Sequence, residues 1–571
     1  MSSFEINSYD FNEMGKINVS KEKRGKDWPV VYLIHNDKEL YIGETQNAYK
    51  RFEQHLNNPV RKKLKKIDII FDDEFNKSAI LDIEQSLIQL CNADGKFNIQ
   101  NLNGGQSEKH NYYQREKYIN KIEAIWDELT RLGMTNMSIE DIKNTDLFKY
   151  SPYNTLTNEQ NEVCKLVIYD IIDKLSQNKS GVSIINGVAG TGKTIVLINI
   201  IFKLINAKKF EIDLSEEDSL TENNQLIHDL REFLDNYNKE LKIGYVVPMK
   251  SIRQTLRAVF RNTKNGLKAN MVIGPFDVFK DEYDILFVDE AHRLCQYKNI
   301  SFRGDFAKCA EKLGQKPDDV TQLDMVLANC KYAVLVYDKN QTVKGSDITG
   351  EQFNRSLKDR DKSTFNLTSQ MRCVGGNLYI DYLSNIFECK QHEKLELENY
   401  DFKLFTNVND MVLKIKELDK KYGLCRNAAG YSWEWISKKC KTYSEVVSNG
   451  LEDIKIGDYK YVWNMNNKEF IISENAINEI GCIHTLQGYD LNYVGVILGK
   501  EIDYDKANNR LVINLDKFYD KYVKQQSDYE TVYNYIINSY KVIMSRGIKG
   551  CFVYACNKNM QEYLEKFINK N

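Results

Sequence analysis

Hydrophobic and polar positions along the chain form two different patterns. From residue 151 onward, short apolar runs such as GVSIING, YDILFVDE and YVGVILG alternate with longer stretches of helical periodicity. Strands that are apolar on both faces and alternate with helices are typical of a parallel α/β sheet. Before residue 106 the pattern instead predicts a hairpin, a basic zone with the sequence VRKKLKK, and a helix near SAILDIEQSLIQLC. We therefore expect an α/β protein with a small front domain.

The chain divides into segments of different character. Its 571 residues are too many for one core and suggest roughly three or four domains. The loop-like NIQNLNGG closes a front domain at residues 1–105, and the sheet pattern fills residues 151–571, which we divide into segments 151–360 and 361–571. Between them, residues 106–150 carry a helical stripe that predicts a connector helix docked on a neighbour. The stripe consists of Ile119, Ile122, Ile125, Trp126 and Leu129.

Composition and charge narrow the function classes only slightly. With 42% hydrophobic and 28% charged residues, the chain is typical of a folded globular protein. The net charge of -2 means that a nucleic-acid partner would have to be bound by local basic patches. One such patch is residues 21–66, with twelve basic and six acidic residues, a net charge of +6. Taken alone, this excess is also typical of a solvated surface.

Cysteine spacing and the lack of long apolar runs indicate the compartment. The twelve cysteines include no C-x-x-C pair, which favours reduced and mostly buried thiols. The first residues, MSSFEINSYDFNEMGK, lack an apolar segment after a basic start, and no run of about 18 apolar residues occurs. We therefore expect a cytoplasmic protein that does not insert into a membrane.

The stretch GVAGTGKT predicts a phosphate-binding loop. It matches G-x-x-x-x-G-K-[ST] and lies between an apolar run and a helical run, which is the context this loop requires. Gly187, Gly190 and Gly192 would let backbone N–H groups face phosphate oxygens at a helix N-terminus. Lys193 would reach the β and γ phosphates, and Thr194 would face Mg²⁺. A chance glycine turn is the competing explanation.

A second feature of a nucleotide site follows about a hundred residues later. In DILFVDEAHR, a buried strand ends in Asp289 and Glu290. An Asp that orients Mg²⁺ and a Glu that polarises water belong at this place. Two carboxylates there could instead cap a helix, but their combination with the phosphate loop favours the catalytic interpretation.

Several further motifs appear in the order found in superfamily 1 helicases. They are LTNEQ, YDKNQTV, LTSQMRC, IHTLQGYDLNYVGVIL and YKVIMSRGIKGCFVY. Over about residues 151–571 the chain resembles these helicases, and among them the Schlafen-type P-loop helicase-like domain. The residues that the resemblance would place around the nucleotide are Gln160, Asp338, Gln341, Arg372, His484, Gln487, Gly488, Asp490 and Arg546.

The resemblance implies two RecA-like parallel-sheet lobes with ATP between them. Gln160 would read the adenine, and Asp338 and Gln341 would sense the γ-phosphate. Arg372 and Arg546 of the second lobe would neutralise charge on the transferring phosphoryl group and let ATP draw the lobes together. The stretch RNAAGYSWEW also resembles a family signature, but its sequence indicates no role.

The front of the chain contains a second set of polar side chains. If the Asn and Asp at 36–37 form a two-residue hairpin turn, Tyr32 lies directly opposite Tyr41 on one face. A helix that begins near residue 45 or 47 would bring Arg51 and His55 together on one side. Two phenols, a guanidinium and an imidazole would then converge.

Glu84 is an unusual acidic residue on the predicted helix after this hairpin. At helical spacing it lies in the middle of the face that should be buried, where an unpaired charge costs several kcal/mol. A bound metal ion would explain it, and so would a buried pair with an Arg or a Tyr. The apolar neighbours on this face are Ile80, Leu87, Ile88 and Cys91.

Over about residues 28–105 this constellation resembles the GIY-YIG nuclease family. Tyr32 matches the tyrosine of the first triad, although VVY replaces the usual Gly-Ile, and YIG at residues 41–43 matches the second. The residues that correspond to the catalytic set are Tyr32, Tyr41, Arg51, His55, Glu84 and Asn98, with Asn101 and Asn103 as competitors for the last position.

The resemblance implies hydrolysis of a phosphodiester at one divalent metal ion. Glu84 would hold Mg²⁺ or Mn²⁺, and Arg51 would neutralise the scissile phosphate. Tyr32, Tyr41 or His55 would orient or deprotonate water, and the choice among them stays open.

The combined expectation is an ATP-dependent motor on nucleic acid that carries or licenses an endonuclease. DNA is favoured over RNA as the substrate, and such a fusion suggests a role in antiviral defence by analogy. Two alternatives stay open: a nucleotide-gated switch that binds nucleic acid without cutting it, and an RNA-directed nuclease. Association with further copies of the chain or with a partner defence protein also stays open.

Overall fold

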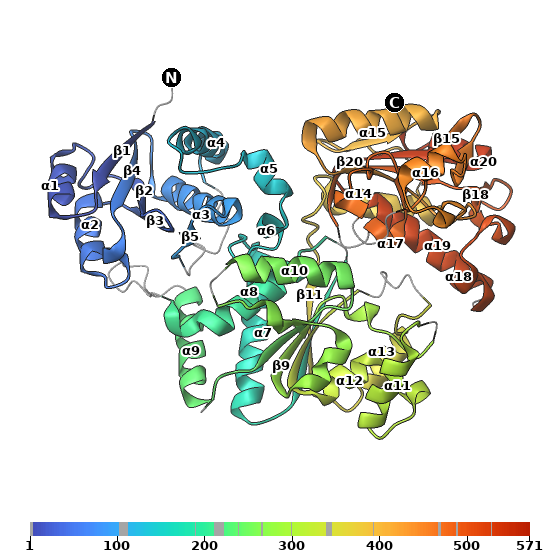
Figure 1. Cartoon of the computed structure of the whole chain (residues 1–571), viewed down its shortest axis with the longest axis horizontal. Coiled ribbons are helices and arrows are strands. Elements are labelled where there is room, and N and C mark those ends of the chain that lie inside the picture. The colour runs from blue at the N-terminus through green and yellow to red at the C-terminus, as the bar shows by residue number, and fades with distance from the viewer. Residues whose placement is uncertain are drawn as a thin grey trace. The chain divides into compact units, whose positions relative to one another are not determined.

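The computed structural model describes most of the chain in two compact units. The described residues are 4–101, 112–188, 190–210, 222–237, 239–263, 266–298, 300–338, 345–391, 393–465, 470–486, 489–526 and 528–571. The first unit comprises residues 1–179, 194–243 and 254–272, and the second comprises residues 180–193, 244–253 and 273–571. Figure 1 labels their elements.

The front domain is built on one mixed five-stranded sheet in the order β1-β4-β2-β3-β5. β1, β4, β2 and β3 pair antiparallel, and β5 joins β3 in parallel. Tyr32 and Phe52 belong to its buried core. The strands are β1 Phe4–Asp10, β2 Val30–His35, β3 Glu39–Thr45, β4 Lys66–Asp72 and β5 Asn98–Ile99, and the helices are α1 Glu13–Lys21, α2 Ala48–Asn57 and α3 Lys77–Asp94.

The hairpin between β2 and β3 has a different register from the predicted one. Its tight turn lies at residues 37–38, one position later than predicted, because Asn36 N donates to Glu39 O and the Asn36 side chain accepts from the N–H groups of residues 38 and 39. Tyr32 is therefore opposite Gly43, and Ile34 is opposite Tyr41. The shift is by two residues, so both tyrosines stay on the predicted face.

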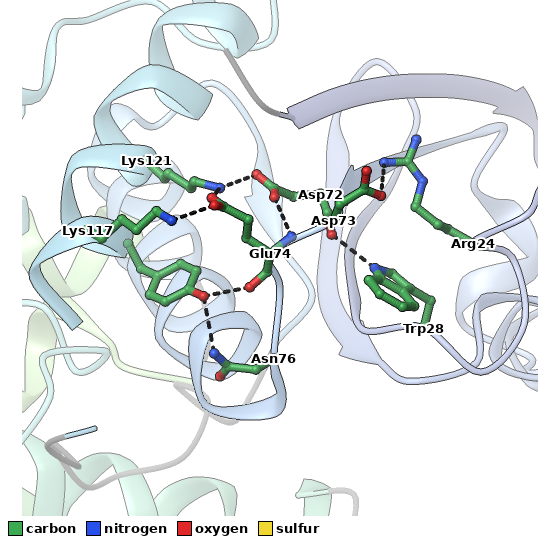
Figure 2. Close-up of polar contacts among 9 residues, drawn as sticks. Arg24, Trp28, Asp72, Asp73, Glu74, Asn76, Lys117 and Lys121 are labelled. Atoms are coloured by element: carbon green, nitrogen blue, oxygen red, sulfur yellow. Dashed lines mark hydrogen bonds and ion pairs between the residues drawn. The ribbon is translucent and has the colours of Figure 1, made fainter. Parts of the chain in front are cut away.

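The predicted connector helix is α4, and it docks on the front domain. Tyr118 and Trp126 are buried, as are most members of the predicted stripe, but Ile119 is exposed. Figure 2 shows polar contacts from Lys117 and Lys121 of this helix to Asp72, the last residue of β4, and to Glu74 just after it. The connector helices are α4 Arg115–Arg131, α5 Ile139–Asn144, α6 Asp146–Lys149 and α7 Asn158–Ser176.

Lobe 1 contains a six-stranded sheet in the order β11-β6-β10-β9-β7-β8. The central pairs are parallel, as the apolar runs predicted. β11 lies beyond the predicted boundary at residue 360 but pairs with β6, so the sheet of lobe 1 extends to residue 367. The strands are β6 Gly181–Gly187, β7 Ile243–Val246, β8 Val272–Ile273, β9 Tyr283–Val288, β10 Cys330–Tyr337 and β11 Lys362–Leu367. The helices are α8 Lys193–Asn206, α9 Glu222–Asn236, α10 Lys250–Thr263, α11 Arg303–Lys312, α12 Gln322–Ala328 and α13 Gly350–Ser356.

Lobe 2 contains a second parallel sheet in the order β16-β13-β17-β20-β12-β21, with two small hairpins. The sheet strands are β12 Asp401–Leu404, β13 Cys425–Ala429, β16 Ile480–Gly481, β17 Leu491–Leu498, β20 Gly547–Ala555 and β21 Asn569–Lys570. The hairpins are β14 Ile454–Ile456 with β15 Tyr459–Tyr461, and β18 Ile502–Asp505 with β19 Arg510–Ile513. The helices are α14 Gly376–Phe387, α15 Val408–Tyr422, α16 Tyr443–Ser448, α17 Ile483–Leu486, α18 Lys521–Gln526, α19 Tyr529–Met544 and α20 Lys558–Leu564.

The signature RNAAGYSWEW has a structural role in lobe 2. It covers part of β13 and the turn after it. Buried Arg426 pairs with Asp419 at 2.8 Å, and Ser432 accepts hydrogen bonds from backbone N–H groups at residues 500 and 501. A Cβ at Gly430 would lie 2.3 Å from the Tyr540 hydroxyl, so only glycine fits there. The side chains of the signature thus pack and form hydrogen bonds inside lobe 2.

Two further expectations concern the cysteines and membrane-spanning helices. All twelve cysteines are free thiols, and most are buried, as predicted. Among the described residues, no helix is both long enough and apolar enough to cross a membrane.

Candidate nuclease and nucleotide sites

The predicted aromatic and basic residues of the front domain do meet at one point. The Tyr32 hydroxyl lies 2.7 Å from His55 Nε2 and accepts a hydrogen bond from Arg51 Nε at 3.3 Å. The Tyr41 ring centroid lies 5.0 Å from that of His55 and 6.3 Å from that of Tyr32. Asn47 caps the first turn of α2, and the i, i+4 spacing then presents Arg51 and His55 to the same phenol.

Gly43 explains why the shifted hairpin register suits this cluster. It lies directly opposite Tyr32 in the sheet. A Cβ at this position would come within 2.2 Å of the Tyr32 hydroxyl oxygen, so any side chain would push the phenol out of place. The glycine of the YIG triad therefore leaves space for the hydroxyl oxygen of Tyr32, which lies on the neighbouring strand.

Glu84 lies on α3 beside this cluster. It is half-buried, whereas its helix neighbours Ile80, Ile88 and Cys91 are buried. Burial raises the pKa of Tyr32 well above its usual value, and Tyr41 and Glu84 raise it further, while Arg51 opposes them. The phenol is therefore neutral near pH 7, and Glu84 is close enough to affect its charge.

Asn101, rather than Asn98, takes the position expected of the closing asparagine. Asn98 begins β5 with an exposed side chain. Asn101 is buried, and its amide accepts from Ile42 N at 3.0 Å and donates to Ile42 O at 2.7 Å. The Asn101 side chain thus bonds both backbone groups of Ile42, the central residue of the YIG triad in β3. The other competitor, Asn103, lies outside the described residues.

Arg61 belongs to the cluster but was not predicted from the sequence. Its Nη1 lies 3.0 Å from His55 Nδ1, and its guanidinium lies 3.8 Å from the centroid of the Tyr41 ring. The residue stands in the basic run RKKLKK, where Lys62 and Lys63 are exposed and only Arg61 turns inward. A short helical turn at residues 61–63 produces this difference, and no periodic signal in the sequence indicates it.

The donor groups at this site fit a divalent metal ion of the Mg²⁺ type. Among the described residues, no group of three or more His, Cys, Asp or Glu side chains could enclose a metal ion. Glu84 offers one hard oxygen ligand beside the cluster that contains Tyr32 and His55. Mg²⁺ is commonly held by one or two carboxylates together with substrate phosphate oxygens and water, so a single carboxylate is sufficient.

The phosphate loop has the predicted backbone shape. Gly190 and Gly192 have φ angles of 89° and 78°, which only glycine adopts without strain. Buried Lys193 donates hydrogen bonds to the carbonyls of Gly187 and Val188 at 2.7 and 2.8 Å. Burial lowers the pKa of this lysine, and nearby carboxylates offset only part of the effect.

Three carboxylates surround the end of this loop in lobe 1. Asp338 Oδ2 lies 3.9 Å from Lys193 Nζ, and Asp289 accepts a hydrogen bond from the Tyr245 hydroxyl at 3.0 Å. Glu290 has a left-handed φ of 50°, which is strained for this residue and typical of functional sites. Burial would raise the pKa of Glu290, but His292 at 2.9 Å, with Lys193 and an arginine of lobe 2, holds it well below its usual value. Glu290 is therefore ionised at neutral pH.

Lobe 2 supplies two arginines, as the motifs predicted. Arg372 Nε pairs with Asp490, and its buried Nη1 has no hydrogen-bond partner among the described residues. The charge of Arg372 affects Lys193, and that of buried Arg546 affects Glu290. Both arginines therefore face the reactive groups of lobe 1.

Gln370 contacts the phosphate loop, although motif reasoning did not single it out. A Cβ on Gly190 would collide with the Gln370 amide oxygen, so the segment LTSQMRC packs directly on the phosphate loop. Met371 N donates to Gly190 O at 2.8 Å, and Arg372 N donates to the Gln370 amide oxygen. The only signal for this contact was the position of Gln370 two residues before Arg372.

Of the remaining predicted nucleotide residues, Thr194 directly follows Lys193 in the first turn of α8 and so lies at the phosphate loop. Gln160 lies in the first unit, where its side chain completes a capping box with Thr157 at the start of α7. His484 lies next to Tyr535 in lobe 2, at 3.5 Å. Gln341, Gln487 and Gly488 lie outside the described residues.

Comparisons with known proteins agree with both predicted resemblances. Residues 180–557 match the family described as Schlafen group 3, DNA/RNA helicase domain, and residues 29–98 match the GIY-YIG catalytic domain. An uncharacterized protein of Saccharomyces cerevisiae is 26% identical over 447 residues, covering 72% of this chain and 90% of its own.

Solved structures of helicases show a weak likeness. The Pif1 helicase from Candida albicans is 13% identical, with a TM-score of 0.27, covering 72% of this chain and 98% of its own. The Pif1 helicase from Bacteroides, in complex with ADP-AlF3 and ssDNA, is 12% identical with a TM-score of 0.23, covering 69% and 93%. Scores this low add no argument to the motif geometry.

The helicase family match spans more than half of the chain, and the GIY-YIG match lies on the domain that holds the tyrosine cluster. The chain therefore belongs to the Schlafen group 3 DNA/RNA helicase domain family and carries a GIY-YIG catalytic domain ahead of it.

Proposed function

We propose that this protein is an ATP-driven, helicase-like motor on nucleic acid that controls a metal-dependent endonuclease at its front. The observation that carries the proposal is that one chain gathers two clusters of reactive side chains. One brings Tyr32, His55 and Arg51 together near Glu84, and the other brings Lys193 near carboxylates of lobe 1 and arginines of lobe 2.

The front cluster suits phosphodiester hydrolysis. Arg51 would neutralise charge on the scissile phosphate, and Tyr32 would orient the attacking water. Glu84 would hold the divalent ion, Mg²⁺ or Mn²⁺, which when bound supplies stabilisation of negative charge on phosphate oxygens. The local net charge of +6 over residues 21–66 supports a polyanionic substrate.

The second cluster suits hydrolysis of ATP. Lys193 and the glycine loop would bind phosphate oxygens, and Glu290, ionised and strained at the end of β9, would polarise water. Thr194 and Asp289 would hold the Mg²⁺ that accompanies ATP. Arg372 and Arg546 would compensate charge on the transferring phosphoryl group, as arginines of a second lobe do in this chemistry.

Three finer statements complete the proposal. We propose DNA rather than RNA as the substrate, and a role in antiviral defence, by analogy between this fusion and other motor-linked nucleases. We propose a cytoplasmic location because the cysteines are free and mostly buried thiols.

The decisive experiment compares wild type, Lys193→Ala and Glu84→Gln on plasmid, linear duplex, single-stranded DNA and RNA, with and without ATP and with Mg²⁺ or Mn²⁺. We expect Lys193→Ala to lower ATP hydrolysis by at least about 100-fold, because a charged phosphate ligand is removed. We expect Glu84→Gln to lower cleavage by a similar factor and to leave ATP hydrolysis intact.

Two exposed residues provide matched controls for the same changes of charge. Glu53→Gln removes a carboxylate of α2, and Lys208→Ala removes a lysine that pairs with Asp235 at the surface. Both variants should keep both activities. Full cleavage by Glu84→Gln would contradict the metal site, and binding without any cleavage by wild type would favour the gated binding switch. Cleavage confined to RNA would replace DNA by RNA in the proposal.

A further inference from the structure

Arg61 makes contacts that a surface lysine or arginine does not make. It is only 8% exposed, whereas its neighbours Lys62 and Lys63 are exposed. Its backbone N–H donates to the Asn58 side chain at 3.2 Å, which helps to start the short helical turn that points it inward. Its guanidinium then lies between the Tyr41 ring and His55.

The contact between Arg61 and His55 determines which ring nitrogen of His55 carries a proton. A guanidinium stays charged and offers only donors. At 3.0 Å from Arg61 Nη1, the Nδ1 atom of His55 must therefore act as an acceptor. A neutral imidazole with a lone pair on Nδ1 carries its proton on Nε2. A protonated imidazole would place two donors against each other and is disfavoured.

The same reasoning extends from His55 to Tyr32. With its proton on Nε2, His55 donates to the Tyr32 hydroxyl oxygen at 2.7 Å. That oxygen also accepts from Arg51 Nε at 3.3 Å. Since two donors occupy the phenol oxygen, the Tyr32 proton is directed away from both of them. The phenol is then oriented by its neighbours rather than free to rotate.

We propose that Arg61 is a positioning residue of the nuclease site, which holds His55 in its Nε2–H form so that His55 orients the Tyr32 hydroxyl. This inference rests on the proposed nuclease function. It also removes His55 from the three groups that could deprotonate water, because its one lone pair is taken by Arg61. A purely structural role, in which Arg61 only packs on Tyr41, is the competing explanation.

The test uses the full chain labelled with ¹⁵N in its histidine rings. The chain has seven histidines, and the signal of His55 is assigned by its loss in His55→Gln. We expect wild type to show His55 protonated on Nε2 alone. In Arg61→Met, which keeps an apolar stem but removes every donor, we expect protonation of Nδ1 to appear and kcat for cleavage to fall by about 100-fold.

His35 and Lys62 provide the controls. His35 belongs to the same sheet and lies 2.9 Å from Asp68, so its unchanged signal shows that the front domain is folded. Lys62→Met removes a charge from the same basic run, and we expect it to raise KM at most, with kcat and the His55 signal retained. If Arg61→Met does not fold, Arg61→Leu replaces it, because leucine likewise offers no donor to Nδ1 and should release the tautomer with the same loss of kcat.

The two readouts separate failure of this inference from failure of the proposed function. Retention of the Nε2–H form in folded Arg61→Met would overturn the inference, whatever the activity. A changed tautomer with an unchanged kcat would overturn it as well. If wild type cleaves nothing, the nuclease function fails, and the claim that Arg61 positions a nuclease site fails with it, while the ring signals alone still report the Arg61–His55 contact.

Discussion

A single buried acid in lobe 2 shows how a local environment determines the chemistry of a residue. Glu501 is fully buried, and its Oε1 accepts a hydrogen bond from the Tyr540 hydroxyl at 2.5 Å. Burial raises the pKa of Glu501 above its usual value, while hydrogen bonds from Ser432 and Tyr540 partly oppose this shift. Unlike Glu290, whose pKa is held low by cations, Glu501 has neutral hydrogen-bond donors.

Glu501→Gln should therefore stabilise the protein relative to wild type, and this difference should grow as the pH rises. Because the folded-state pKa is raised, the folded state binds the proton more tightly than the unfolded state, and stability is lost as the pH rises from about 4.5 through the folded-state pKa. Glutamine carries no charge to bury and still offers an oxygen to Tyr540. We expect the melting temperature of the variant to exceed that of wild type at pH 8 and to approach it at pH 5, as measured by thermal unfolding in both buffers. A difference that is equal at both pH values would contradict this prediction.

At the scale of elements, the docking of α4 on the front domain depends on one buried ion pair. Lys121 contacts Asp72 at 2.5 Å and Glu74 at 2.7 Å, and Lys117 contacts Glu74 at 2.5 Å (Figure 2). The side chain of Asp72 is completely buried, whereas that of Glu74 is 43% exposed. A buried charge is stable only beside an opposite charge, whereas an exposed charge is screened by water. The two lysines should therefore contribute very different amounts to the free energy of unfolding.

Lys121→Met should destabilise the protein by about 3 kcal/mol, because it leaves the Asp72 carboxylate buried without its ammonium partner. Lys117→Met is the matched control, and it should change stability little, since Glu74 remains partly in water and keeps Lys121. Urea unfolding of both variants, followed by circular dichroism, gives the two free energies. Equal effects of the two changes would show that burial of Asp72 does not govern the docking.

At the scale of the whole molecule, the two reactive clusters belong to different compact units. The tyrosine cluster lies entirely in the first unit, and Lys193, Glu290, Arg372 and Arg546 lie in the second. The contacts of the second cluster join both lobes, since Arg372 pairs with Asp490 and approaches the phosphate loop. A nucleotide that bridges these groups should stabilise the second unit selectively.

A nonhydrolysable ATP analogue with Mg²⁺, at about 100 times its Kd, should stabilise wild type by about 2.7 kcal/mol. We expect Lys193→Ala to abolish this gain and Arg372→Ala to reduce it, because each removes a cation that faces the nucleotide. Glu84→Gln should keep the full gain. Arg355→Ala, which removes an exposed arginine that pairs with Asp324 in lobe 1, serves as the control. Thermal shift assays on the four variants would contradict the assignment if Arg372→Ala retained the whole effect.

The sequence alone determined the features that depend on neighbours in the chain. The glycines of the phosphate loop require positive φ angles wherever the loop occurs, and Asn47 caps α2 from the position next to it. The alternation of apolar runs with helical periods predicted parallel-sheet structure, because a strand buried on both faces must be apolar along its length, and the helicase resemblance implied its division into two lobes. The order of the motifs then indicated the resemblance to superfamily 1 helicases. The two tyrosine triads and the residues after them indicated the resemblance to the GIY-YIG family.

Only the tertiary structure decided which distant residues meet. The Asn101 side chain bonds the backbone of Ile42 in β3, and Arg61 enters the tyrosine cluster through one short turn. Arg372 pairs with Asp490 across 118 positions of sequence. Such contacts depend on how separate elements pack, so no local period or spacing encodes them. The hairpin register was also decided by such contacts, because the side chain of Asn36 closes a turn at residues 37–38 and Gly43 leaves space for Tyr32.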